Sequence, residues 1–203
     1  MSDLVKIAKT EISNSNKLCV IAGLNVLEDD QLTFEVAERL KKITEAQGNS
    51  FIFKASFDKA NRSSVDSYRG PGLEKGLEIF RELKKSDYQL ITDIHEISQV
   101  EQISEVVDII QIPAFLCRQT DLIKEACQSG KPLNIKKGQF LSPDQMKNII
   151  EKCSNFGNDQ IMLCERGTSF GYDNLVVDML GMSKLKTFNC PIIFDVTHSL
   201  QLP

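Results

Sequence analysis

The sequence predicts an α/β protein, a (β/α)8 TIM barrel with seven of its eight strands present in this chain. Seven short apolar runs typical of buried strands alternate with amphipathic helical patterns, and no GxGxxG turn follows the first run. Strands without a polar face belong to a parallel sheet covered by helices. The strand-like runs cover residues 19–23, 51–56, 89–94, 107–113, 133–137, 160–167 and 191–198.

The carboxyl ends of these runs favour a closed barrel over an open doubly wound sheet. Nearly every run closes on functional side chains, namely Asn25, Lys54, Asp93 with His95, Gln111, Lys136, Arg166, and Asp195 with His198. A barrel gathers such positions around one mouth, where its active sites are built. An open sheet would spread them along a line, since neighbouring strands lie about 4.8 Å apart.

Helical spacing predicts the elements between the strands. The clearest apolar stripe is Leu32, Val36, Leu40 and Ile43, with Asp29 or Asp30 as the cap and Gly48 as the stop. Other stripes are Leu73–Leu77–Phe80, Leu122–Ile123–Ala126, Met146–Ile149–Ile150 and Leu175–Met179–Met182, and Pro143 after Ser142 marks a helix start.

The two ends of the chain complete the predicted fold. The first seventeen residues, with VKIA before a polar SNSN turn, predict a β-hairpin at the bottom of the barrel. A barrel needs eight strands and typically about 250 residues. We therefore expect residues 1–203 to form a single barrel domain whose C-terminal part is missing from this chain.

Composition restricts the class of partner. A net charge of −4 and a pI near 5.3 argue against nucleic-acid and membrane-surface partners. No apolar run reaches the length of a membrane span, and the N-terminus has no signal-peptide core, so we expect a cytoplasmic protein. The six cysteines show no CxxC pair, which predicts reduced thiols used as small hydrophobic side chains.

The segment Phe51–Gly72 has the composition of a phosphate-binding loop at a strand end. Lys54 follows an apolar strand, and Lys59, Asn61, Arg62 and Ser63 follow in a polar loop. A lysine at such a strand end is costly to bury unless an anion meets it. Lys136 lies in a similar strand, and Arg166 precedes a glycine that lets the backbone approach a ligand. Five converging cations imply two anionic groups.

His95 and His198 are the only histidines, and each follows an aspartate by two or three residues. Asp93 and Asp195 could orient a reacting hydroxyl or act in proton transfer. Among the residues of this chain, only His198 and acidic side chains are candidate metal ligands, since Asn25 is a poor ligand beside a thiolate or an imidazole.

Taken together, these segments resemble the 3-deoxy-D-manno-octulosonate 8-phosphate synthase family, and KANRSS is the most specific of them. The other matching segments are GLNVLE, ITDIHE, DIIQIPAFLCRQTDL, NIKKGQF, GYDNLVVDML and FDVTHSLQ. The resemblance implies condensation of phosphoenolpyruvate with D-arabinose 5-phosphate and water, a step toward bacterial lipopolysaccharide. It also implies a homotetramer.

The resemblance also implies roles for the site residues. Phosphoenolpyruvate would be held by Lys54, Lys59, Gln111, Lys136 and Arg166, and arabinose 5-phosphate by Asn61, Arg62 and Ser63. Asn25, Asp93 and His198 would lie near the reacting atoms. Metal-dependent members carry cysteine at the position of Asn25, so the asparagine implies the metal-independent class, with no cofactor.

Two other functions remain open. One is a related synthase that uses erythrose 4-phosphate, against which the KANRSS loop argues. The other is a non-catalytic barrel that binds sugar phosphates, which would bind ligand without turnover.

Overall fold

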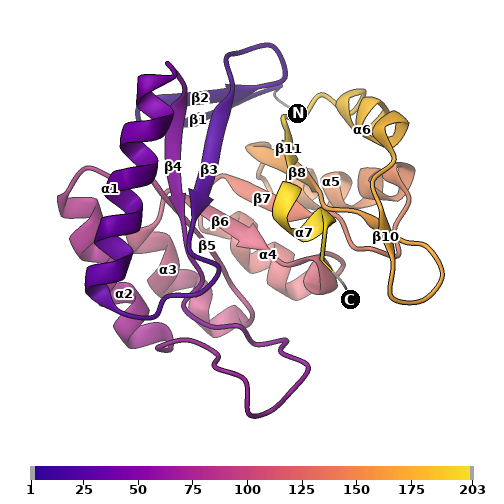
Figure 1. Ribbon diagram of the computed structural model, residues 1–203. Helices are drawn as coiled ribbons and strands as arrows, with labels where there is room; N and C mark the ends of the chain where they lie inside the picture. Colours follow the sequence, from indigo (N-terminus) through magenta and orange to yellow (C-terminus); the bar gives the residue numbers. More distant parts are fainter. Residues whose placement is uncertain (1–2, 202–203) are drawn as a thin grey trace. The chain divides into compact units, whose positions relative to one another are not determined.

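The computed structural model describes residues 3–201, in which seven parallel strands form an α/β fold of the TIM-barrel type (Figure 1). The strands are β3 (Cys19–Gly23), β4 (Ser50–Lys54), β5 (Leu90–Asp93), β6 (Ile109–Ile112), β7 (Leu133–Lys136), β8 (Ile161–Glu165) and β11 (Ile192–Phe194). Their order in the sheet follows their order in the chain. A doubly wound sheet reverses its strand order at a switch point, whereas a barrel does not. The predicted fold class is therefore confirmed.

The chain divides into two compact units. One comprises Lys17–Ile110, and the other comprises Gln111 onward together with the residues up to Asn16. We call them the 17–110 unit and the 111–203 unit. No helix within residues 3–201 is long and apolar enough to cross a membrane.

The 17–110 unit contains β3, β4 and β5 with three helices, which are α1 (Asp30–Ala46), α2 (Leu73–Lys85) and α3 (Val100–Val106). Helix α1 packs on β3 and β4, and α2 packs against α3 (Figure 1). Helix α1 is capped by Asp29, whose carboxylate accepts a hydrogen bond from the Leu32 amide at 2.8 Å. Fully buried Phe53, Phe57 and Phe80 belong to its core.

The predicted apolar face of α1 is wrong by about one residue. The structure buries Thr33, Ala37 and Thr44, whereas Ile43 of the predicted stripe is 50% exposed and the other members are half-buried. Small side chains at the contact let the helix approach β3 and β4 closely, so the larger ones lie at the margin of the contact.

The 111–203 unit contains β7, β8 and β11 with helices α4 (Thr120–Gln128), α5 (Met146–Asn155), α6 (Met179–Lys186) and α7 (Val196–Ser199). The predicted N-terminal hairpin is present as β1 (Leu4–Ile7) and β2 (Thr10–Ser13), and residues 1–2 of the prediction lie outside the described residues. Asn14 Nδ2 donates to the Cys190 carbonyl at 2.8 Å, and the Ile192 amide donates to Asn14 Oδ1 at 2.9 Å. The hairpin thus contacts the amino-terminal end of β11.

Two predicted elements near the C-terminus are corrected. The run 191–198 is a strand only as far as Phe194, because Asp195 caps α7 by accepting a hydrogen bond from the His198 amide at 3.0 Å. The stripe that begins at Leu175 is helical only from Met179, since Leu175 lies in β10 (Leu175–Val176), which pairs with β9 (Thr168–Ser169).

All six cysteines are free thiols, and five of them are buried. Burial raises the pKa of Cys19 and of Cys190 to about 11. A thiol with such a pKa carries little thiolate near neutral pH and is a weak nucleophile. These findings confirm the prediction that the cysteines serve as small hydrophobic side chains.

Candidate functional site

A first polar cluster lies in the 17–110 unit, at the carboxyl ends of β4 and β5. The Ser56 hydroxyl donates to Asp93 Oδ1, and Lys59 Nζ donates to Ser56 Oγ at 2.9 Å. His95 Nε2 lies 3.3 Å from Asp93 Oδ2. We call Lys54, Ser56, Lys59, Asp93 and His95 the aspartate cluster.

Asp93 is ionised in this cluster. Its burial alone would raise the pKa, but the hydrogen bond from His95 and the charges of Lys54 and Lys59 together hold the pKa of Asp93 well below its usual range. A carboxylate with so low a pKa is a weak base, so the geometry favours orienting a substrate hydroxyl over removing its proton.

His95 is also available for a ligand contact. Its Nδ1 is buried and makes no hydrogen bond within residues 3–201. The ring meets the Phe57 ring edge-on, with 5.7 Å between the ring centroids. Because buried polar atoms usually have a partner, an unpaired ring nitrogen at a strand end is typical of a ligand site.

The loop after β4 exposes the three side chains predicted to hold a sugar phosphate, Asn61, Arg62 and Ser63. The Lys59 amide donates to the Arg69 carbonyl at 2.6 Å, and Arg69 Nε donates to Asp58 Oδ1 at 2.8 Å. These contacts close the loop at its base and leave its tip in solvent, where a phosphate can reach it.

Asn25 lies beside the aspartate cluster, in the exposed turn after β3. The amides of Leu24 and Leu27 donate to the carbonyls of Lys54 and Ser56, each at 2.9 Å. This approach requires glycine at the end of β3, because a Cβ on Gly23 would lie 2.0 Å from the Lys54 carbonyl oxygen.

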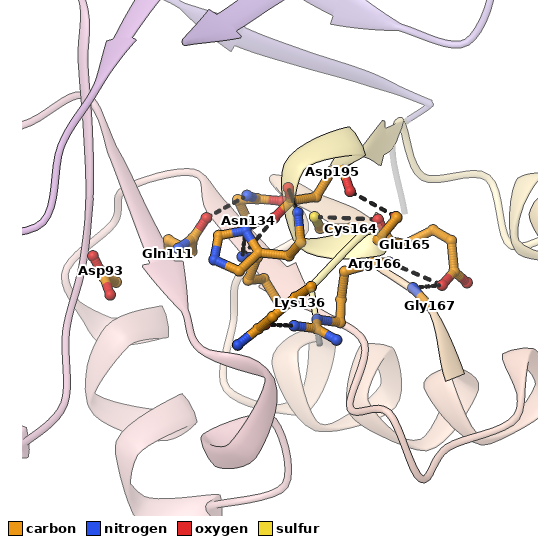
Figure 2. A network of polar contacts seen from close by, with 12 residues as sticks. Asp93, Gln111, Asn134, Lys136, Cys164, Glu165, Arg166, Gly167 and Asp195 are labelled. Atoms are coloured by element: carbon orange, nitrogen blue, oxygen red, sulfur yellow. Dashed lines mark hydrogen bonds and ion pairs between the residues drawn. The ribbon is translucent and has the colours of Figure 1, made fainter. Parts of the chain in front are cut away.

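The second polar cluster lies in the 111–203 unit and joins β7 to the start of α7 (Figure 2). Lys136 Nζ and His198 Nδ1 lie 2.6 Å and 2.8 Å from Asp195 Oδ2. Lys136 Nζ is also 3.3 Å from His198 Nδ1. We call Lys136, Asp195 and His198 the lysine cluster. Burial would raise the pKa of Asp195, but His198 and Lys136 together hold it well below its usual range.

Gln111 and Asn134 form a buried amide pair in the same unit (Figure 2). Asn134 Nδ2 donates to Gln111 Oε1 at 3.1 Å. This contact fixes the orientation of the Gln111 side chain, which the sequence predicts as a phosphoenolpyruvate ligand.

Arg166 gives the clearest indication of an anion-binding site. Its side chain is only 3% exposed, and Nη2 donates to Gln201 Oε1 at 2.7 Å. Nε and Nη1 are buried and make no hydrogen bond within the described part of the chain. Burial lowers the pKa of Arg166 because it penalises the charged form. A buried guanidinium with two unused donors is suited to a phosphate or carboxylate.

The structure therefore assigns each predicted residue to one of two groups. In the 17–110 unit, Lys54, Lys59 and Asp93 come together, with Asn25 beside them and the 61–63 segment on the adjacent loop. In the 111–203 unit, Lys136 and His198 come together, while Gln111 lies in β6 and Arg166 directly follows β8, the two strands that flank β7.

The sequence interpretation missed Ser56, Asn134, Lys137 and Glu165. Ser56 lies two residues after Lys54, and Asn134 lies two residues before Lys136. Asn134 and Lys136 lie two residues apart in β7 and so share a face, which means that the alternation could have identified Asn134. Among residues 3–201, no three His, Cys, Asp or Glu side chains group as a metal site requires.

The chain matches one family model and several named proteins over nearly its whole length. The model of the DAHP synthetase I family matches residues 4–203. A 2-dehydro-3-deoxyphosphooctonate aldolase of Hahella chejuensis (strain KCTC 2396) is 56% identical over 200 residues, covering 98% of this chain and 71% of that protein. The proteins of the same name from Pseudomonas syringae pv. syringae (strain B728a) and Pasteurella multocida (strain Pm70) are 54% and 56% identical over 201 residues. Each comparison covers 98% of this chain, and 72% and 71% of those proteins.

The resemblance found in the sequence is therefore confirmed: the chain belongs to the DAHP synthetase I family, beside the proteins named 2-dehydro-3-deoxyphosphooctonate aldolase.

Proposed function

We propose that this protein condenses phosphoenolpyruvate with D-arabinose 5-phosphate and water to give 3-deoxy-D-manno-octulosonate 8-phosphate and inorganic phosphate. The observation that carries the proposal is the 53–56% identity, over nearly the whole chain, to proteins named 2-dehydro-3-deoxyphosphooctonate aldolase. The buried Arg166 guanidinium with two unused donors supports an anionic substrate. We assign the reaction to the cytoplasm, as the sequence leads us to expect, and to a homotetramer, as the family resemblance implies.

The reaction forms one carbon–carbon bond and breaks one carbon–oxygen bond. C3 of phosphoenolpyruvate attacks the aldehyde carbon of the sugar, whose oxygen takes up a proton and becomes a hydroxyl. Water adds at C2 and loses a proton. The bond between C2 and the bridging oxygen then breaks, and this oxygen leaves with the phosphate. Cations around the phosphate and carboxylate groups stabilise the negative charge that gathers on the departing phosphate.

The two polar clusters suit different parts of this reaction. We assign five residues to phosphoenolpyruvate. They are Lys54 and Lys59 of the aspartate cluster, and Gln111, Lys136 and Arg166 of the 111–203 unit. Ionised Asp93 is suited to orient a hydroxyl. His198, held by Asp195 and beside Lys136, is a candidate for proton transfer.

Arabinose 5-phosphate is assigned to the exposed loop that carries Asn61, Arg62 and Ser63. A guanidinium and a hydroxyl on a solvent-exposed loop can meet a phosphate without prior burial of their charge. The KANRSS sequence of this loop is also our reason for preferring arabinose 5-phosphate to erythrose 4-phosphate as the second substrate.

The test is release of inorganic phosphate from phosphoenolpyruvate by the purified native protein, with arabinose 5-phosphate or erythrose 4-phosphate, with and without a chelator. We expect release only with arabinose 5-phosphate and at the same rate in chelator. Loss of activity in chelator would contradict the metal-independent class that Asn25 implies. Binding of phosphoenolpyruvate without release with either sugar would favour a binding protein.

A further inference from the structure

A buried ion pair joins Lys137, the residue after β7, to Glu165, the last residue of β8. Their side chains are 1% and 3% exposed, and Lys137 Nζ lies 3.5 Å from Glu165 Oε1. The Lys137 amide also donates to the Cys164 carbonyl at 2.8 Å, which extends the pairing of the two strands. Burying two charges is costly, so the pair calls for an explanation beyond packing.

The pair lies on the face of the strands opposite to the residues assigned to phosphoenolpyruvate. Successive side chains along a strand point to opposite faces. Lys137 follows Lys136, and Glu165 precedes Arg166, so both members of the pair point away from the face that these two cations share. Lys137 and Glu165 therefore act on a substrate only through their neighbours.

Their hydrogen bonds enclose the backbone of Arg166. Glu165 Oε1 accepts from the amides of Arg166 and Gly167 at 2.9 and 2.7 Å (Figure 2). Lys137 Nζ donates to Thr168 Oγ1 at 2.8 Å and to the Leu141 carbonyl at 3.3 Å. Together with the ion pair to Glu165, these bonds give Lys137 Nζ three partners, and the segment 165–168 is held from both sides.

The turn at Gly167 makes such support necessary. Gly167 has φ of +98°, a conformation that other residues rarely adopt, so the chain turns sharply directly after Arg166. The guanidinium then depends on the fixed peptides of residues 166 and 167 for its direction, since two of its three nitrogens have no partner within the described residues.

We propose that the Lys137–Glu165 pair is a positioning device that holds the Arg166 guanidinium toward an anionic group of phosphoenolpyruvate. The choice of ligand rests on the proposed function. The pair itself touches no substrate, so its removal is expected to weaken phosphoenolpyruvate binding while leaving the sugar phosphate almost unaffected.

The first test measures phosphoenolpyruvate affinity by titration calorimetry in Glu165→Gln, which keeps an acceptor oxygen and removes the charge. A misplacement of about 1 Å can cost on the order of 100-fold in a site that depends on geometry. We expect phosphoenolpyruvate affinity to fall at least about tenfold, and the KM for arabinose 5-phosphate to change less than about twofold. Lys152→Met is the matched control, because Lys152 also binds a carbonyl (Arg118) and a threonine hydroxyl (Thr120), but at a half-buried position away from Arg166.

A double-mutant cycle separates positioning from general support of the fold. If Glu165 acts through Arg166, Glu165→Gln has no further effect on phosphoenolpyruvate affinity in an Arg166→Ala background. Equal losses in both backgrounds would overturn the proposal, as would equal losses for both substrates.

Two variants keep the test decisive if Glu165→Gln does not fold. Lys137→Met with Glu165→Gln removes both charges and leaves no buried ion unpaired, so we expect restored stability with phosphoenolpyruvate affinity still reduced. Thr168→Val removes a single contact of Lys137 at a half-buried position, and we expect a smaller loss of the same affinity. Wild-type affinity in either folded variant would contradict the positioning role.

The two proposals fail in different ways. A wild-type protein that does not bind phosphoenolpyruvate would overturn the proposed function. A wild-type protein that binds it, with Glu165→Gln binding equally well, would overturn only the positioning role of the pair.

Discussion

Arg62 is an exposed cation near the tip of the loop assigned to the sugar phosphate, and it offers a residue-scale test of that assignment. Replacing it with alanine removes charge-assisted hydrogen bonds to a phosphate, each worth about 1.5–3 kcal/mol. We expect Arg62→Ala to raise the KM for arabinose 5-phosphate by about 10- to 100-fold and that for phosphoenolpyruvate by less than about threefold. Steady-state kinetics with each substrate varied in turn measures both values.

Arg81→Ala is the control for this substitution. It removes an exposed arginine from the same unit, on the outer face of α2, and should leave both KM values unchanged. Equal increases for the two substrates in Arg62→Ala would contradict the assignment of the loop to the sugar phosphate.

At the residue scale, the sequence identified most charged members of the site but not their supports. Lys54, Lys136 and Arg166 could be predicted, because a cation at the end of an apolar strand is unusual. Lys137 and Glu165 could not, since nothing in a sequence shows that two charges 28 positions apart meet in a buried pair. Ser56 was missed for a different reason, as serine carries little signal until its partner Asp93 is known.

Helix α2 determines where the segment after β4 can lie, and Gly76 is its contact point. A Cβ at this position would lie 2.5 Å from Phe57 Cβ, and Phe57 is almost fully buried. Overpacking of this kind typically costs about 1–3 kcal/mol, and alanine recovers about 1 kcal/mol of helix propensity. Because a contact of 2.5 Å with the Cβ of a buried ring is severe, the overpacking cost falls in the upper part of its range. We therefore expect Gly76→Ala to lower the free energy of unfolding by about 1–2 kcal/mol, measured by urea denaturation.

The comparison for this variant is Arg81→Ala in the same helix, which also introduces alanine but meets no neighbour in the core. It should leave the free energy of unfolding within about 0.5 kcal/mol of the wild-type value. A Gly76→Ala protein as stable as the wild type would mean that Phe57 can move without cost.

At the scale of elements, the sequence predicted the strands well and their ends poorly. Apolar runs show which residues are buried, but the end of a strand depends on hydrogen bonds such as that between Asp195 and the His198 amide, which begins α7. The small β9–β10 pair was also missed. Two-residue strands are too short for a periodic pattern.

On the scale of the whole molecule, each unit carries one carboxylate whose pKa is held far below its ordinary value of 3.8, Asp93 in one and Asp195 in the other. In the unfolded chain these groups regain their ordinary pKa and bind protons more readily. The free energy of unfolding therefore rises with pH in the range where these two carboxyl groups are protonated in the unfolded chain but ionised in the folded one. The contribution of both groups is fully present above about pH 5 and is lost as the pH falls below about 4.

Asp195→Asn tests this dependence. Lys136 then loses its nearest counter-charge while only 8% exposed, so we expect the variant to be less stable than the wild type at pH 7. Between pH 5 and pH 2 it should lose less stability than the wild type, because one of the two titrating carboxylates is gone. Urea denaturation at successive pH values measures both effects, with exposed Asp66→Asn as the control. Parallel curves for the wild type and Asp195→Asn would show that Asp195 does not titrate with folding. If the free energy of unfolding depends less steeply on pH in Asp195→Asn than in the wild type and in Asp66→Asn, the acid stability of the molecule depends on Asp195, the carboxylate that also holds His198 in the candidate site.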